Sequence, residues 1–202
     1  MPHLHSIDQW LTAHAPITAT SLRPPATVEQ LDRAERELGH PLPDELRQLY
    51  LWHDGTVGLA GSSAPFDIEP SLYFQPLDEA LAARQWLNDL YATINQDDYI
   101  TWRAHWLPIA ADDCGAYVVV ETQGPHTGRV IYRSDEDGPH LERAWPTLTH
   151  WADALSTALT TGEPFMRVHL PVPVDGTLTW DWVGPSAPTP PSFPPGFQLP
   201  QT

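Results

Sequence analysis

Residues 106–133, WLPIAADDCGAYVVVETQGPHTGRVIYR, decide the fold class of this chain. They contain three short apolar or alternating runs, at 106–110, 116–121 and 129–133, and the residues between the runs are rich in Asp and Gly. Runs of this length and composition favour β-strands, and the short turn-forming segments between them favour antiparallel pairing. The stretch therefore predicts a meander of antiparallel strands.

Helical patterns lie on both sides of this meander, each marked by an apolar stripe, a capping residue or both. The predicted helices cover residues 6–14, 28–38, 43–55, 76–91 and 147–162. The segment 56–70 is rich in Gly, Ser and Pro and is predicted to be a loop, whereas 72–74 and 141–145 are predicted to be brief strands. The chain therefore changes from helix to sheet near residue 98 and returns to helix at Thr147.

The C-terminal part carries a different pattern. Residues 165–174 and 177–183 alternate apolar and polar side chains around Asp175-Gly176, a dipeptide that suits a type I′ hairpin turn. Prolines dominate and charges vanish from Gly184 onward, so a flexible, disordered tail is expected there. The predicted organisation is a helical extension over 1–21, a main domain over 22–162, a hairpin extension over 163–183 and a proline-rich tail over 184–202.

The charge of the chain argues against nucleic acid as its partner. The 202 residues include 26 acids against ten basic side chains, all of them arginine, which leaves a formal net charge of −16. Phosphate binding needs clustered Lys and Arg, and the chain has no basic run. Ordinary solubility explains an acidic surface of this kind, and so does attraction of a cationic partner. Composition leaves both explanations open.

Cysteine use and the N-terminus bear on the compartment. Cys114 is the single cysteine and has no intramolecular partner, which fits a reducing cytoplasm. Residues 1–10 lack the basic and apolar regions of a signal peptide, and no stretch is apolar enough to span a membrane. We therefore expect a cytoplasmic protein without membrane association.

Motifs for catalysis and for metal binding are weak throughout the chain. A lysine-containing phosphate loop is impossible without lysine, and no Gly-x-Ser-x-Gly motif occurs. His3 and His5 have no second pair to complete a metal site, and Asp135-Glu136-Asp137 lacks the alternating oxygen ligands of a calcium loop. We expect no enzymatic activity, no cofactor and no metal. A hydrolase that uses paired carboxylates stays open because acids are abundant.

An ordered set of short motifs runs from Leu22 to Gly162. In the first half these motifs are Glu35 with Leu38-Gly39, Leu42-Pro43, Tyr50 and His53-Asp54-Gly55. In the second half they are Trp106-Leu107-Pro108-Ile109-Ala110, Asp112 with Gly115, Tyr117 to Val120, Gly128-Arg129-Val130 and the helix after Trp145. In order and spacing these motifs resemble the SUKH superfamily, which includes fungal cell wall assembly regulators and many bacterial immunity proteins.

The resemblance implies an α+β fold, in which a mixed, largely antiparallel sheet is flanked by helices, and a binding role without catalysis. It further implies that a bacterial member neutralises a toxin, often a nuclease, by direct binding. A structural role in the family pattern is expected for Glu35, Leu38, Gly39, Leu42, Pro43, Gly55, Pro108 and Gly115. Cys114 and the segments after Gly162 depart from that pattern, which leaves the partner's identity open.

The leading hypothesis is a cytoplasmic immunity protein whose acidic surface binds a basic, nuclease-type toxin domain. The candidate contact residues are Trp52, Asp54, Asp67, Glu69, Tyr73, Asp112 and Asp113, with the two aromatic residues as anchors. The alternative is a scaffold or regulatory module that recruits a housekeeping protein, with the proline-rich tail as a docking peptide. The toxin, the interface and the oligomeric state stay open.

Several other tryptophans are expected to be buried. Trp10, Trp86 and Trp151 lie on the apolar faces of predicted helices. Trp180 and Trp182 share one side of the terminal hairpin, because side chains alternate along a strand. We expect the first three in the core and the last two covering the sheet.

Overall fold

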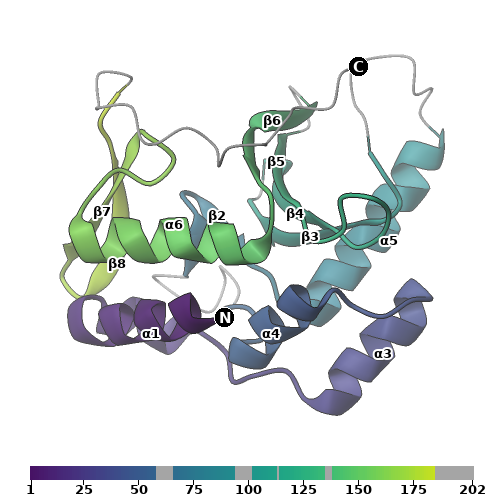
Figure 1. Cartoon of the computed structure of the whole chain (residues 1–202), viewed down its shortest axis with the longest axis horizontal. Coiled ribbons are helices and arrows are strands. Elements are labelled where there is room, and N and C mark those ends of the chain that lie inside the picture. The colour runs from purple at the N-terminus through teal and green to yellow at the C-terminus, as the bar shows by residue number, and fades with distance from the viewer. Residues whose placement is uncertain (58–65, 94–101, 113, 135–137, 185–202) are drawn as a thin grey trace.

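The chain forms helices first and strands mainly in its second half (Figure 1). The computed structural model describes residues 1–57, 66–93, 102–112, 114–134 and 138–184. The described helices are α1 (Pro2–His14), α2 (Pro16–Ser21), α3 (Val28–Leu38), α4 (Asp44–Trp52), α5 (Leu77–Thr93) and α6 (Leu148–Thr161). The described strands are β1 (Asp67–Glu69), β2 (Leu72–Phe74), β3 (Trp106–Ala111), β4 (Ala116–Glu121), β5 (Val130–Ser134), β6 (Gly138–Trp145), β7 (His169–Val174) and β8 (Thr177–Trp182).

Six strands form one sheet in the spatial order β1-β2-β3-β4-β5-β6, which is also their order in the chain. Every pair of neighbouring strands is antiparallel, so the predicted meander and the α+β class are confirmed. The chain passes through α5 between β2 and β3. The sheet is antiparallel in all its described pairs rather than mixed.

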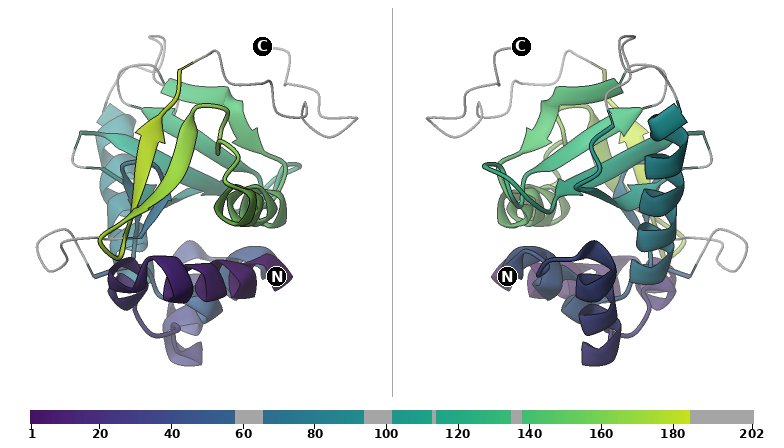
Figure 2. Two further views of the ribbon diagram at one scale, coloured as in Figure 1. Left: turned by 90° about the vertical axis from the view of Figure 1, so that its left-hand side faces the viewer. Right: turned by 90° about the vertical axis from the view of Figure 1, so that its right-hand side faces the viewer.

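Alternation along the strands gives the sheet two apolar faces. Val118 and Val120 of β4 belong to the main core, together with buried residues of α1, α3, α4 and α6. Val119 points to the opposite face and packs in a second cluster with Leu87 and Tyr91 of α5. Accordingly, α5 and α6 lie on opposite sides of the sheet, and the N-terminal helices form a layer beneath it (Figure 2).

Capping residues place several helix ends where the sequence predicts them. The Thr27 hydroxyl accepts a hydrogen bond from the Gln30 N–H, and the Gln30 side chain accepts one from the Thr27 N–H, so a capping box begins α3. Gly39 ends α3 in the left-handed conformation, with φ of 79°. The Thr147 hydroxyl caps the first turn of α6, and Gly162 ends that helix.

The N-terminus and the segment before β2 differ from the predictions. The helix expected over 6–14 is longer, and Pro16 begins α2 instead of ending the helical region. Proline suits the first turn of a helix because its missing N–H would have no partner there. The predicted loop over 56–70 contains β1, which is too short to show a periodic signal and is defined by its pairing with β2.

The terminal hairpin forms as predicted, but the elements on which it packs are helices. β7 and β8 pair around Asp175 and Gly176, whose φ values of 48° and 82° suit a type I′ turn. They form a separate two-stranded sheet that packs on α1, α2 and α6. Trp86 on α5 is 55% exposed, so the prediction that it lies in the core is wrong, and Trp182, expected to cover the sheet, is 67% exposed. Periodicity assigns a residue to a face, but tertiary packing decides whether that face is covered.

The two ends of the chain are described to different extents. α1 runs along α6 and contributes Leu4, Ile7 and Leu11 to the main core (Figure 1). The predicted proline-rich tail lies outside the described residues from position 185 onward. Among the described helices, none is both long and apolar enough to cross a membrane.

Candidate functional site

Asp54 joins three parts of the fold and is buried. Its Oδ1 accepts the Leu77 N–H at 2.9 Å, which satisfies a free donor at the start of α5. Its Oδ2 accepts a hydrogen bond from Gln30 Nε2 at 3.2 Å and lies 3.7 Å from Arg23 Nη2. Asp54 is only 3% exposed, which does not fit the predicted contact with a partner. The fold itself uses this carboxylate.

Gly55 allows the chain to turn against the start of α5. Its φ is 75°, and a Cβ at this position would lie 2.2 Å from the backbone nitrogen of Pro76. Glycine is therefore required both by the conformation and by the close approach of the two segments. Tyr50 is fully buried, and burial, followed by the charges of Asp54 and Asp78, raises the pKa of its hydroxyl well above the usual value.

Trp52 is half-buried and held by contacts within the chain. Its Nε1 donates to Asp8 Oδ2 of α1 at 2.8 Å, and its ring stacks on Phe74 with centroids 6.4 Å apart. His53 Nε2 lies 3.2 Å from Asp8 Oδ1, and His53 Nδ1 donates to the Arg23 carbonyl at 2.6 Å. Trp52 and His53 thus tie α1 to α4, and Trp52 is not a free anchor.

The other residues of the expected structural pattern hold the helix pair and the β3–β4 region. Glu35 Oε1 accepts the Leu42 N–H at 3.2 Å and an Arg47 N–H at 2.9 Å, which joins the end of α3 to α4. Pro108 is buried at a bulge in β3, and Gly115 has φ of 92° in the β3–β4 turn. The remaining pattern residues are Leu38, buried in α3, Gly39, which ends α3, and Pro43, the N-cap of α4.

Three of the predicted contact residues meet at one corner of the sheet. Asp67 in β1 lies opposite Tyr73 in β2, and Tyr73 lies opposite Ala111 in β3. Directly opposed residues share a face of the sheet, so Asp67 and Tyr73 are neighbours on one face. Asp112 follows Ala111 at the end of β3. We call Asp67, Tyr73 and Asp112 the β1–β3 corner.

The two carboxylates of the β1–β3 corner differ in their hydrogen bonds. Asp112 Oδ1 accepts the N–H groups of Cys114 and Ala116, each at 2.8 Å, and so holds the β3–β4 turn. Within the described residues, Asp67 accepts only the Ser71 N–H, at 3.1 Å from its Oδ2. Burial raises the pKa of Asp67 to about 6, although the Ser71 hydrogen bond acts in the opposite direction. Asp67 is therefore a half-buried acid, and within the described residues one backbone hydrogen bond is all that offsets the cost of burying its charge.

Other buried carboxylates in this chain have an arginine. Glu121 receives two hydrogen bonds from Arg129, at 2.9 and 3.1 Å, in the geometry of a bidentate pair. Asp54 has Arg23, as described above. Among the described residues, no cationic side chain pairs with Asp67. Asp67 is thus the exception among these acids.

Two further acidic candidates, Glu69 and Asp113, belong to the same region of the chain. Glu69 belongs to β1, but its side chain, like the whole of Asp113, lies outside the described residues. In the part of the chain that the structure covers, no three His, Cys, Asp or Glu side chains come together as metal ligands. The described corner offers a carboxylate beside an aromatic ring, which is chemistry that recognises a cation.

The sequence of this chain matches one known protein family. The sequence profile of the SMI1 / KNR4 family (SUKH-1) matches residues 25–154, more than half of the 202 residues. The chain belongs to the SUKH-1 family. A search of curated proteins finds no match. SUKH-1 membership confirms the resemblance and fits a protein-binding module of the immunity or regulatory kind, in a family that is generally non-catalytic.

The SUKH-1 match covers the turn at Asp54 and the β1–β3 corner. It leaves out α1, α2 and the β7–β8 hairpin, which pack together on one another and on α6. Although these elements lie outside the matched residues, α1 shares the main core with the matched part.

Sequence reasoning missed a buried arginine in this SUKH-1 protein. Arg133 of β5 is fully buried, and its guanidinium carbon lies 5.0, 5.7 and 5.9 Å from the ring centroids of Tyr91, Trp102 and Tyr117. It also donates a hydrogen bond to the Tyr91 hydroxyl. One feature of the sequence indicates this burial. Side chains alternate between the two faces along a strand, so Arg133 lies on the same face as the buried Ile131.

Proposed function

We propose that this SUKH-1 protein is a cytoplasmic, non-enzymatic immunity protein that binds and neutralises a basic, nuclease-type bacterial toxin domain. The observation that carries the proposal is that the chain uses its own arginines internally while many of its acids stay exposed. A nuclease attracts a polyanion and therefore tends to have a basic active face, which an acidic inhibitor can reach quickly and cover.

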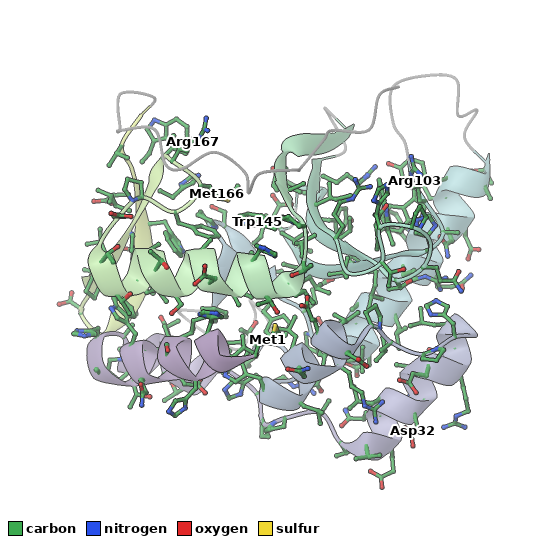
Figure 3. The ribbon with its side chains drawn as sticks, in the orientation of Figure 1. Met1, Asp32, Arg103, Trp145, Met166 and Arg167 are labelled. Atoms are coloured by element: carbon green, nitrogen blue, oxygen red, sulfur yellow. The ribbon has the colours of Figure 1, made fainter. Side chains whose placement is uncertain are left out.

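Most arginines with described side chains are engaged within the protein. Ion pairs with its own carboxylates join Arg23 to Asp54, Arg33 to Glu37, Arg47 to Glu35 and Arg129 to Glu121. Arg133 is enclosed by aromatic rings, and Arg84 donates to the Ala104 carbonyl at 2.9 Å. The exposed Arg103, just before β3, and Arg167, just before β7, lie far apart, so these two side chains form no common basic patch (Figure 3).

Several acids lie exposed and, within the described residues, have no paired cation. They include Glu29, Asp44, Asp78, Asp89, Glu163 and Asp181. Each intramolecular ion pair neutralises one arginine and one carboxylate, so the charges left unpaired on the described surface are mainly negative. A surface of this kind supports attraction of a basic protein that weakens with salt.

We place the contact surface at the β1–β3 corner, with Glu69 and Asp113 as its neighbours in the chain. Tyr73 supplies an aromatic side chain, and Asp67 supplies a carboxylate that pairs with no cation among the described residues. Asp54 and Trp52 are left out of this surface because both are held by contacts within the fold.

Co-expression with a toxin encoded in the adjacent reading frame tests the proposed function. We expect this protein to restore growth to cells that express the toxin, and the purified pair to form a complex that weakens as salt rises. A host in which the toxin kills equally well with and without this protein would rule out the immunity function.

A scaffold or regulatory module that recruits a housekeeping protein is the second candidate. The β7–β8 hairpin with its exposed Trp182, and the uncharged proline-rich sequence 185–202, lie outside the SUKH-1 match and favour this candidate. Removal of residues 185–202 separates the two functions. Loss of partner binding on removal supports the scaffold, and full toxin neutralisation after removal supports the immunity protein.

A further inference from the structure

We propose that Asp67 is the docking point for an arginine side chain of the partner protein, whose guanidinium group bonds to the carboxylate and stacks on the ring of Tyr73. The inference rests on the proposed function for the source of that arginine, a basic protein partner. It adds two points to that function: Asp67 is the residue that binds the cation, and the site prefers guanidinium to ammonium groups.

Within the described residues, no cationic side chain pairs with Asp67. The chain contains no lysine, and the segments outside the described residues contain no basic side chain. The basic residues His140 and Arg143, of which only the backbone is described, belong to β6, at the opposite edge of the sheet from β1. The arginines that pair with carboxylates in the described part are committed to other acids. None of the ion pairs between described residues includes Asp67, so we expect its cation to come from another molecule.

The β1–β3 corner has the geometry for a planar cation. Asp67 Oδ2 accepts the Ser71 N–H, while no group in the described part of the chain donates to Oδ1. Tyr73 is the direct cross-strand neighbour of Asp67 on the same face, and β1 is the edge strand of the sheet. A guanidinium group can bond to a carboxylate and stack on an aromatic ring at once, whereas an ammonium group acts as a point charge.

Burial makes the ionised form of Asp67 depend on such a cation. The side chain is half-buried, and burial raises its pKa to about 6. A partly desolvated carboxylate without a counter-charge is unfavourable, and a cation brought within hydrogen-bonding distance reverses that cost. Arg23 and Arg129 supply this counter-charge to Asp54 and Glu121. We infer that a partner protein supplies it to Asp67.

Asp112 provides a matched control at the same corner. It follows Ala111, the cross-strand partner of Tyr73, and its Oδ1 is already used by two backbone N–H groups of its own turn. If general negative charge attracts the partner, Asp67→Asn and Asp112→Asn will weaken binding equally. If Asp67 is the docking point, Asp67→Asn alone will have the large effect.

NMR on the full chain tests the preference without any knowledge of the partner. The side-chain carboxyl carbon of Asp67 is followed over pH in ethylguanidinium chloride and in ethylammonium chloride at equal concentration. We expect ethylguanidinium to move the midpoint of the Asp67 titration about one pH unit lower, and ethylammonium to move it less. Tyr73→Ala should abolish the difference and Tyr73→Phe should keep it. Equal responses to the two ions, or a response no larger than that of the exposed Asp78, would overturn the proposal.

Toxin neutralisation by the same variants separates this inference from the proposed function. If the wild-type protein neutralises the toxin and Asp67→Asn does so equally well, the docking point is wrong and the immunity function stands. If the wild-type protein fails to neutralise but Asp67 prefers guanidinium by NMR, the function is wrong and the cation site stands. Selective loss in Asp67→Asn, with Asp112→Asn unaffected, supports both.

Discussion

At the residue scale, Asp54 and Asp67 are two acids whose surroundings in the fold give them opposite effects on stability. Asp54 caps α5 and has Arg23 beside it, so its charge is used by the fold. Asp67 has one backbone N–H and, among the described residues, no cation. The first carboxylate therefore stabilises the protein, and the second one costs stability at neutral pH.

Substitution of Asp54 should destabilise the protein strongly. Asp54→Ala removes the acceptor for the Leu77 N–H and leaves Arg23 without its carboxylate, so we expect the free energy of unfolding to fall by about 2–4 kcal/mol. Urea denaturation measures this change. Asp78→Ala, at an exposed position in the first turn of α5, is the control and should cost about 0.5 kcal/mol. Equal losses in the two variants would refute the capping role of Asp54.

Substitution of Asp67 should have an effect that depends on pH. Its pKa of about 6 lies above the ordinary value of 3.8, so the folded state holds a proton that the unfolded state loses between those values. The free energy of unfolding therefore falls as pH rises from about 4 to 6. Asp67→Asn removes this penalty, keeps an acceptor for Ser71, and should gain on the order of 1–2 kcal/mol at pH 7.5.

Denaturation at two pH values checks this prediction for Asp67. The gain in Asp67→Asn should nearly disappear at pH 4, where the wild-type carboxyl group is protonated in the folded state and becomes so in the unfolded state. A gain of the same size at both pH values would mean that burial of the charge is not its cause. A variant that is more stable and yet binds the partner less well would show that Asp67 is kept for binding.

At the element scale, α1 is an addition to the SUKH-1 part that nevertheless belongs to the same core. It lies outside the family match, but Leu4, Ile7 and Leu11 are buried with residues of the family domain. Asp8 bonds to Trp52 and His53 and so fastens α1 to α4. The family match begins at residue 25, and the packing of α1 runs across the predicted boundary at residue 21.

Substitution of Asp8, the residue that fastens α1 to α4, should destabilise the protein. Asp8→Ala removes the acceptor for the Trp52 Nε1–H and for His53, and we expect a loss of about 1–2 kcal/mol with faster amide exchange in α1. Hydrogen–deuterium exchange measures this opening. Gln9→Ala is the control, because the Gln9 side chain is exposed and bonds only to His5 on the same helix within the described contacts. Unchanged exchange in Asp8→Ala would show that apolar packing alone holds α1.

Elements with strong local signals could be predicted, and elements without them could not. The capping box at Thr27 and the cap at Thr147 define helix ends through hydrogen bonds within three residues, so sequence is sufficient there. β1 has three residues and is a strand because β2 lies beside it. The exposure of Trp86 likewise depends on what packs on α5, which no local pattern contains.

At the scale of the whole molecule, the distribution of charge matters more than its total. The formal charge of −16 follows from composition, but the described arginines are largely used in internal ion pairs and ring contacts. Exposed acids such as Asp44, Asp89 and Glu163 are left without a pairing cation in the described part of the chain. The net charge makes the long-range field of the protein negative, and the unpaired acids present that charge at the surface, which favours encounter with a basic partner.

If the proposed toxin is the partner, the association rate should depend steeply on salt. Raising ionic strength from about 50 to 500 mM shortens the screening length, and we expect the association rate constant to fall by about tenfold or more. The dissociation rate constant should change less, because contacts at the interface govern it. Stopped-flow mixing measures the first, and competition with unlabelled protein the second. An association rate that does not change with salt would contradict electrostatic attraction.

The sequence by itself determined the order of helices and strands in the main domain, several helix ends, the SUKH resemblance and the acidic character. These depend on residues close together in the chain or on composition. Only the tertiary structure decided that Asp54 is buried, that Trp52 bonds to Asp8, and that Asp67, Tyr73 and Asp112 share one corner. The physical reason is that burial and the pairing of charges depend on neighbours distant in sequence, which only the folded chain brings together.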